Sequence, residues 1–469
     1  MPVQRTSAKP VDRDRLTIGE LVAYGTGGLP FQLGVDSFKT LVNPIFNIVL
    51  GVNPAAIGAV MMIARIWDAI LDPLMGWISD NTRSRWGRRK PYILGGALLS
   101  AVFFAAIWFV PRGAAPGFAL GWLAVTALLF YAAFTVFCVP YLTLALEMTP
   151  SYSERTRVTA ARTLFGSFAI FIATWSLSVA QSGVFSDTMT GMRVIGVATG
   201  ICFILMALPS VVVTRERYLH LASKQPKQSL RDAFRGTFGN RDFRVLMGLT
   251  ALFVIGTQTF NALGIYVNTY HVFGGDLKKA AYLGGLVATS TIIAVWILIP
   301  LVARGSGILG KDRMLRVCLS LGTVGGIGQW FAFDPRWPMA QLALPVFLVP
   351  ASAGFWVIVN SMKADMCDAE EHRSGIRREG AYAAVSSWIQ KFAASFTFSL
   401  SGLVLVLVGF DQARGADQAP GALLGLRIAL AMGPVCAYAV GLFILRQYSL
   451  SSERMAVIRA ELEARRSTV

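Results

Sequence analysis

Two carboxylates lie four residues apart in a long apolar stretch of the chain, at Asp68 and Asp72. On a helix this spacing puts them on one face, where they repel each other unless a cation lies between them or one carries a proton. A charge near the centre of a bilayer costs at least about 2.5–3.5 kcal/mol, so it is usually paired and functional. The pair therefore predicts a binding site for Na⁺ or H⁺. Permanent ion pairs with Arg65 and Lys391 are the structural alternative.

A second polar stripe comes earlier in the chain, where Gln32, Asp36 and Lys39 follow one another at spacings of four and three. These residues also share a helix face. Pro30 and Pro44 flank them and should loosen the helix locally. The stripe predicts one wall of a substrate cavity. The alternative is an Asp36–Lys39 pair that only neutralises itself, and the spacing leaves both open.

Other apolar stretches carry further candidates for this cavity: Arg162, Gln258, Asn261 and Trp356. Buried amides also join neighbouring helices, and aromatic side chains often mark the membrane interface. A contact with substrate and a purely structural role are therefore both open for each of them.

The chain turns basic directly after the two carboxylates, in the loop DNTRSRWGRRKP. Here Arg85, Arg88 and Arg89 can hold Asp80 against cytoplasmic helix ends, as a latch that joins two helix bundles in one conformation. The same arginines can also set orientation, because cytoplasmic loops of membrane proteins are rich in Lys and Arg. The two roles are compatible.

The elements that position these residues must be membrane-spanning helices. Hydrophobic residues make up 54% of the 469-residue chain and charged residues 15%, against about 25% charged residues in soluble domains. A spanning helix needs about 20 mostly apolar residues. Twelve such segments are expected, at 20–50, 55–79, 92–111, 117–147, 157–184, 191–213, 244–271, 280–303, 313–333, 338–362, 378–409 and 421–446.

A polar, basic gap after the sixth segment divides the chain into two halves of six. Lys and Arg are concentrated in alternate loops, which places both termini in the cytoplasm. The turns WGRRKPY and LGKDRML echo each other, as in transporters with repeated halves. The expected order is a cytoplasmic tail at 1–19, a six-helix bundle at 20–214, a cytoplasmic loop at 215–243, a second bundle at 244–447 and a cytoplasmic tail with a short amphipathic helix at 448–469.

Several function classes fit the sequence poorly. In a soluble chain a net charge of +17 would suggest binding to nucleic acid. Here the Lys and Arg residues flank apolar segments, as expected for the cytoplasmic loops of a membrane protein. The five cysteines have no disulfide or metal-ligand spacing, and no cofactor is expected. The chain has no catalytic motif of the kind that a membrane enzyme would need. It also has no repeated pore-lining segment, which a channel would need. We expect a monomeric transporter of a small molecule in the cell membrane.

Four stretches of the chain match one known family: RIWDAILDPLMGW, RSRWGRRKPY, FCVPYLTLALEMTPSYSERTR and ADMCDAEEHRSGIRREGAYAAVSSWIQK. They resemble the glycoside–pentoside–hexuronide:cation symporters of the major facilitator superfamily, which include melibiose permease. The likeness spans nearly the whole chain. It implies an all-α integral membrane protein with the major facilitator fold, twelve transmembrane helices in two pseudo-symmetric six-helix bundles. It also implies symport of a sugar with Na⁺ or H⁺ by alternating access.

The resemblance implies roles for single residues. The family's two cation-binding aspartates match Asp68 and Asp72, and Thr135 matches a threonine of helix four that adds an oxygen ligand. The helix-eleven lysine near the cation site matches Lys391, which we expect to couple ion and substrate together with Arg65. An arginine early in helix five matches Arg162 at a looser spacing.

Departures from the family lie mainly on the sugar side. Leu71 replaces an asparagine beside the second aspartate, which leaves the ion open between Na⁺ and H⁺. Gln32 and Cys138 replace two sugar-binding aspartates, and Leu142 replaces a tryptophan. This more apolar helix-four wall would suit a lysolipid, as carried by the related sodium-dependent lysophosphatidylcholine symporters. A lysolipid or another amphiphile is the alternative substrate.

A retained positive charge in the cavity favours an anionic sugar instead. Asp36 can replace the lost helix-one acid one turn along, while Lys39, Arg162 and Lys391 add positive charge. The first expectation for the substrate is therefore an anionic or neutral sugar, with a uronate-bearing glycoside as an example of the anionic kind.

Overall fold

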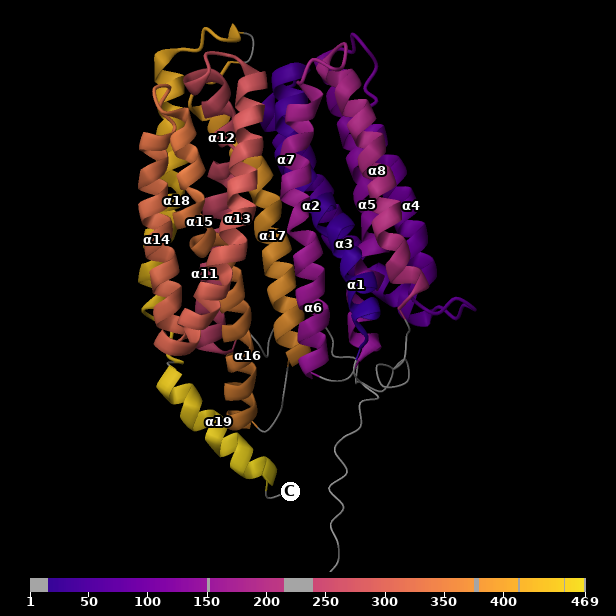
Figure 1. Ribbon diagram of the computed structural model, residues 1–469, viewed down its shortest axis with the longest axis vertical. Helices are drawn as coiled ribbons and strands as arrows, with labels where there is room; N and C mark the ends of the chain where they lie inside the picture. Colours follow the sequence, from indigo (N-terminus) through magenta and orange to yellow (C-terminus); the bar gives the residue numbers. More distant parts are fainter. Residues whose placement is uncertain are drawn as a thin grey trace, which may run out of the picture.

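The computed structural model describes residues 16–149, 152–214, 239–374, 379–411, 414–450 and 452–467. Within these ranges every regular element is a helix, and none is a strand. The helices run along one common direction in two groups, one from each half of the chain (Figure 1). Below, the end of the molecule that carries α19 and the start of α1 is called the terminus side, and the other end the far side.

The N-terminal half supplies all six expected segments as helices. The first is interrupted, and the fifth is made of two helices in line. In order they are α1 (Ile18–Thr26), α2 (Gly28–Val42) and the π-helical η2 (Asn43–Val49); α3 (Pro54–Asn81); α4 (Lys90–Ile107); α5 (Pro116–Met148); α6 (Tyr152–Gly166) with α7 (Phe168–Ala180); and α8 (Thr188–Val212).

The C-terminal half repeats this plan and adds a tail helix. In order its elements are α11 (Arg241–Asn261), α12 (Gly264–Tyr266) and η3 (Val267–Val272); α13 (Leu277–Leu309); α14 (Lys311–Ala332); η4 (Pro338–Ala343), α15 (Pro345–Val349), η5 (Pro350–Gly354) and α16 (Phe355–Ser374); α17 (Glu379–Leu407); α18 (Pro420–Leu445); and α19 (Ser452–Ser467). The six membrane segments plus the expected tail helix are thus present.

Ten of the twelve segments are long and apolar enough to cross a membrane, counted over the described residues. The other two are the interrupted first segment, which carries Asp36 and Lys39, and α14, whose first turn carries Lys311 and Asp312. The tenth segment is longer than expected, because its helix continues through α16 to Arg373 rather than ending at residue 362.

Caps and prolines determine where several helices begin or bend. Asn53 accepts hydrogen bonds from two backbone N–H groups of α3, and Pro54 takes the first position of that helix. Asp187 caps α8 in the same way, and the hydrogen bond from the backbone N–H of Thr190 holds its pKa below the usual value. The loosening expected near Pro44 is present as the π-helical η2.

Each half of the chain has a core of its own. In the N-terminal bundle the Phe38, Phe104 and Phe130 rings pack together, with centroids 4.8–6.3 Å apart. In the C-terminal bundle Phe253 stacks on Phe355 at 3.9 Å. Ring pairs of this kind add to the free energy that each bundle gains by burying apolar area.

The two bundles touch through α3 against α17 and through α7 against α13. On the far side their backbones are in direct contact, because a Cβ added to Gly58 would lie 2.5 Å from the carbonyl oxygen of Phe398. The Trp175 indole donates to Thr289 across the second contact at 3.1 Å, and Lys278 Nζ is 3.3 Å from the carbonyl oxygen of Ser182. The far side of the molecule is therefore closed.

The two Gly-plus-basic turns occupy matching places in the two bundles. Gly87 and Gly310 both have positive φ, at 103° and 90°, a conformation that glycine adopts without steric cost. Each turn precedes a basic residue that pairs with a carboxylate on a later helix. These pairs are Arg89 with Glu147, and Lys311 with Asp365.

The tail helix α19 is docked on the C-terminal bundle. Met455 is 3% exposed and belongs to the core of that bundle, while Arg313 reaches Glu453 at 3.2 Å. A contact of 2.5 Å between His372 Nε2 and Glu461 Oε2 ties α19 to α16. The amphipathic face therefore packs against protein.

Candidate functional site

Four charged residues from both bundles meet inside the membrane. Arg65, Asp68 and Asp72 lie on α3, and Lys391 lies on α17. Lys391 Nζ is 3.3 Å from Asp68 Oδ2 and also pairs with Asp72 Oδ2. Arg65 Nη1 is 3.3 Å from Asp68 Oδ2. The structure thus brings these four residues together, and Lys391 connects the two bundles.

The two carboxylates have different surroundings. Asp68 has a side chain only 3% exposed, and its Oδ1 accepts a hydrogen bond from the Thr135 hydroxyl on α5 at 2.7 Å. The Asp72 side chain is 26% exposed, yet its Oδ1 is buried and has no hydrogen-bond partner. A buried acceptor without a donor costs free energy, so this oxygen is free for an incoming ligand.

The charges of this cluster sum to zero, with Arg65 and Lys391 against Asp68 and Asp72. The Arg65 guanidinium also lies over the Tyr131 ring, 5.2 Å from its centroid. These contacts are the ion pairs named from the sequence as the structural alternative. They are also compatible with a cation site, because the lysine ammonium lies where a cation would bridge both carboxylates.

The residues of the polar stripe on α2 contact one another. Gln32 Nε2 donates to Asp36 Oδ2 at 2.9 Å, and Lys39 Nζ lies 3.8 Å from Asp36 Oδ1. The Lys39 side chain remains 33% exposed. The internal pair is therefore present, and part of the stripe is still accessible to a solute.

Two further candidates of the N-terminal bundle lie in different environments. Arg162 on α6 is half-buried, with its guanidinium 5.5 Å from the centroid of the Phe31 ring of α2. It therefore lies next to the α2 stripe. Cys138 is 5% exposed within the core of the bundle, and Leu142 packs against the same core. These two residues do not present an open apolar wall.

The three candidates of the C-terminal bundle differ in burial and in their contacts. Gln258 Oε1 is buried without a hydrogen-bond partner, while Asn261 is exposed at the end of α11. The Trp356 ring stands edge-on to Phe253 and Phe355, with centroids 5.9 and 5.5 Å away. Trp356 thus helps to form the core, and contact of these three candidates with a substrate stays a prediction.

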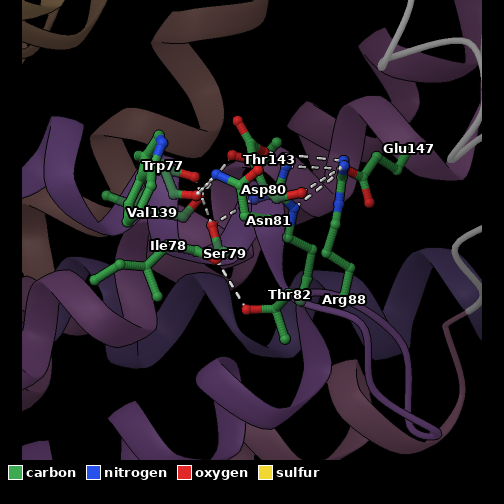
Figure 2. Close-up of polar contacts among 12 residues, drawn as sticks. Trp77, Ile78, Ser79, Asp80, Asn81, Thr82, Arg88, Val139, Thr143 and Glu147 are labelled. Carbon is green, nitrogen blue, oxygen red and sulfur yellow. Dashed lines mark hydrogen bonds and ion pairs between the residues drawn. The ribbon is translucent and has the colours of Figure 1, made fainter.

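The basic loop after α3 forms a network inside one bundle. Arg88 and Arg89 both pair with Glu147 at the end of α5, and Arg89 also pairs with Asp80 at the end of α3. Figure 2 shows Arg88 directed toward Glu147, with Asp80 beside them. Arg85 is exposed. A latch between the two bundles therefore stays a prediction, since these described contacts are all within the N-terminal bundle.

Comparison with protein families decides the class of the chain. A model described as MFS/sugar transport protein matches residues 23–452. The chain belongs to this family. It is accordingly a multi-pass membrane transporter rather than an enzyme, and the resemblance inferred from its motifs is confirmed.

Relatives of this transporter are matched along nearly their whole length. The uncharacterized symporter YnaJ of Bacillus subtilis (strain 168) is 27% identical, over 96% of each chain. The glucuronide carrier protein homolog of Escherichia coli (strain K12) is 22% identical, over 95% of each chain. Among solved structures the nucleoside transporter NupG superposes with a TM-score of 0.65 at 15% identity, over 92% of this chain and 100% of NupG. The last match confirms the major facilitator fold.

Sequence reasoning missed three charged residues of the transporter. Glu147 is the buried partner of the basic loop, and Asp365 holds Lys311 at 2.7 Å. Lys363 lies half-exposed on α16. The last two fell beyond the expected end of the tenth segment. The similarity between the two basic turns was the signal that could have identified Glu147 and Asp365. Each turn carries buried or half-buried positive charge, which is stabilised by a carboxylate partner.

Proposed function

We propose that the transporter carries a sugar or glycoside together with Na⁺ or H⁺, by alternating access of a central site to the two sides of the cell membrane. The match to the sugar-transport family and the symporter names of its relatives support this function. We further propose that both termini lie in the cytoplasm, on the basis of the Lys- and Arg-rich loops. We also propose that the transporter acts as a monomer.

The observation that carries the proposal is the ion cluster formed by α3 and α17. Lys391 of one bundle binds both carboxylates of the other, and one oxygen of Asp72 is free. A cation that binds Asp68 and Asp72 takes over the task of Lys391, since two adjacent carboxylates need one positive partner. Binding of the cation would thereby release a link between the bundles.

Arg65 and Thr135 would then keep Asp68 in place during this exchange. Both contact Asp68 from the N-terminal bundle itself, at 3.3 and 2.7 Å, so they do not depend on how the two bundles are arranged. The cation would bind Asp68, Asp72 and the Thr135 hydroxyl, which are oxygen ligands suited to Na⁺. A proton would occupy Asp72, the carboxylate with a free oxygen.

An anionic sugar is the substrate that the α2 stripe supports best. Lys39 is partly accessible beside Asp36, and Arg162 lies next to α2 with no carboxylate contact among the described residues. Gln32 can donate to a sugar hydroxyl if it leaves Asp36. The relative named glucuronide carrier protein homolog supports this choice. Burial of Cys138 removes the main reason to prefer a lysolipid.

Uptake by purified protein in proteoliposomes tests the proposal. Labelled glucuronide, glucose and xylose are offered with a Na⁺ gradient, a proton gradient or neither. We expect uptake of one of them to require one gradient, and Asp68→Asn and Asp72→Asn each to abolish that requirement. Asp187→Asn is the matched control, since it makes the same chemical change at an exposed cap. Gradient-driven uptake by both site variants at the wild-type rate would refute the cation site.

A further inference from the structure

A cavity of about 190 Å³ lies between the two bundles near the far side. Its walls come from α2 and α7 of the N-terminal bundle and from α12, η3, α13 and η4 of the C-terminal bundle. It is separate from the cluster around Asp68, which none of its lining residues belongs to.

The wall of this cavity is mainly apolar, with Leu177, Val287 and Phe333 among its lining residues. Its two amides are turned toward each other: Asn268 Nδ2 donates to Gln341 Oε1 at 3.0 Å, and Gln341 Nε2 donates to Asn268 Oδ1 at 2.7 Å. Each amide thus uses a donor and its acceptor on the other. The two amides therefore leave few free polar groups in this part of the wall.

The size of the cavity indicates what it can take. Apolar protein cavities of about 150 Å³ stay dry and bind benzene. A volume of about 190 Å³ therefore fits one six-membered apolar ring or a short branched alkyl group.

The polar stripe of α2 leads into this cavity. Gln32, Asp36 and Thr40 follow at spacings of four, so they share a helix face, and Thr40 lines the cavity. Four helical residues rise about 6 Å. A solute whose polar ring contacts Asp36 would therefore reach the cavity with a group attached to that ring.

We propose that this cavity is a subsite for the apolar aglycone of a glycoside, such as a phenyl group. The proposal rests on the sugar-transport function above and names the class of sugar derivative. Because both bundles line the cavity, the aglycone contributes binding energy in the conformation with a closed far side. Glycosides with an apolar aglycone are then bound more tightly than free or methylated sugars.

Two glycines in the cavity wall can be substituted to test its role. A Cβ at Gly284 would meet only Thr174 Cγ2, at 3.6 Å, and one at Gly264 only Phe333 Cζ, at 3.9 Å. These are ordinary contact distances, so a Cβ at either position fits without moving the backbone, and a larger side chain there takes up space at the cavity wall. Gly285 has no such room, since its Cβ would lie 2.9 Å from the Trp175 ring.

The test compares the binding of methyl and phenyl β-D-glucuronide, and of the two corresponding glucosides, by calorimetry on the full chain in nanodiscs. In the wild type we expect the phenyl compound of the bound sugar to bind about tenfold more tightly than the methyl compound, because its ring leaves water. Gly284→Leu and Gly264→Leu should each abolish this difference and leave the affinity for the methyl compound unchanged. Gly248→Leu, at an exposed position with nothing within 4 Å, should retain the difference.

Equal affinities for the methyl and phenyl compounds in the wild type would overturn the proposal, as would binding of neither. Loss of the difference in Gly248→Leu to the same extent would do so too. Tighter binding of lysophosphatidylcholine than of phenyl glucuronide, lost in Gly284→Leu, would assign the cavity to an acyl chain instead. Failure of cation-driven uptake with the phenyl preference intact would refute the transport proposal alone.

Discussion

Closure of the far side depends on two glycines at which α3 and α17 touch. A Cβ at Gly58 would lie 2.5 Å from the Phe398 carbonyl oxygen and 3.0 Å from Ser399 Cα. A Cβ at Gly402 would overlap the Pro54 carbonyl oxygen in the same way. Both neighbours are backbone atoms, which cannot rotate aside. Gly58→Ala and Gly402→Ala should therefore each force the two helices apart on the far side.

The size of the effect follows from the overlap. Extra methyl groups in a well-packed contact cost about 1–3 kcal/mol. This cost applies only while the far side is closed, because the helices are apart when it is open. Since about 1.4 kcal/mol is a factor of ten in an equilibrium, each variant should shift the balance toward an open far side by about 5- to 150-fold.

Spin labels at Ser182 and Lys278 report this shift. The two positions are exposed and lie across the bundle contact, with Lys278 Nζ 3.3 Å from the Ser182 carbonyl oxygen. Pulsed distance measurements in a cysteine-free background should give a short distance in the parent and a longer one in Gly58→Ala. Gly76→Ala, on the same helix, is the control, since its Cβ would meet only Val139 Cγ1 at 4.0 Å. A distance distribution unchanged in Gly58→Ala and Gly402→Ala would refute the reasoning.

Three further predictions concern the charged groups. Lys391→Met should leave Asp68 and Asp72 without their shared partner, so thermal stability should become more dependent on Na⁺ or on low pH than in the wild type; an unchanged dependence contradicts the exchange mechanism. Glu147→Gln should lower the unfolding free energy, measured by denaturation, by less than the roughly 3–5 kcal/mol that an uncompensated buried charge costs, because Arg89 at 1% exposure would lose Glu147 but keep Asp80. Thr135→Val should weaken cation affinity about tenfold by removing the hydrogen bond to Asp68, while Thr135→Ser retains it.

Hydropathy was sufficient to predict the helices of this fold. Each membrane segment needs an apolar run of fixed length, and a helix was found at each of the twelve expected places. Helical spacing likewise placed Asp68 and Asp72 on one face. Both inferences use only local sequence, and the physics that decides them is local too.

Contacts between distant parts of the chain could be named only where charge required a partner. Lys391 was named as a partner of Asp68 and Asp72 in the structural alternative, since an isolated charge is costly in a membrane, and the family resemblance placed it near the cation site. The depth of Cys138 in the core was not predictable, since burial depends on which helices surround α5. The tail helix shows the same limit: the sequence predicted an amphipathic helix there, but not that Met455 would pack against the C-terminal bundle.

Neutrality of the cluster around Asp68 has an electrical consequence. Two positive and two negative groups cancel, so the empty carrier crosses between its conformations with no net charge in this cluster. Addition of one cation and an uncharged sugar gives a complex of charge +1, whose passage through 100 mV is worth about 2.3 kcal/mol. Addition of one cation and a uronate gives a neutral complex, on which the potential does no work. The charge of the sugar thus decides whether the membrane voltage adds to the ion gradient in driving uptake. For a uronate, only the concentration gradients drive it.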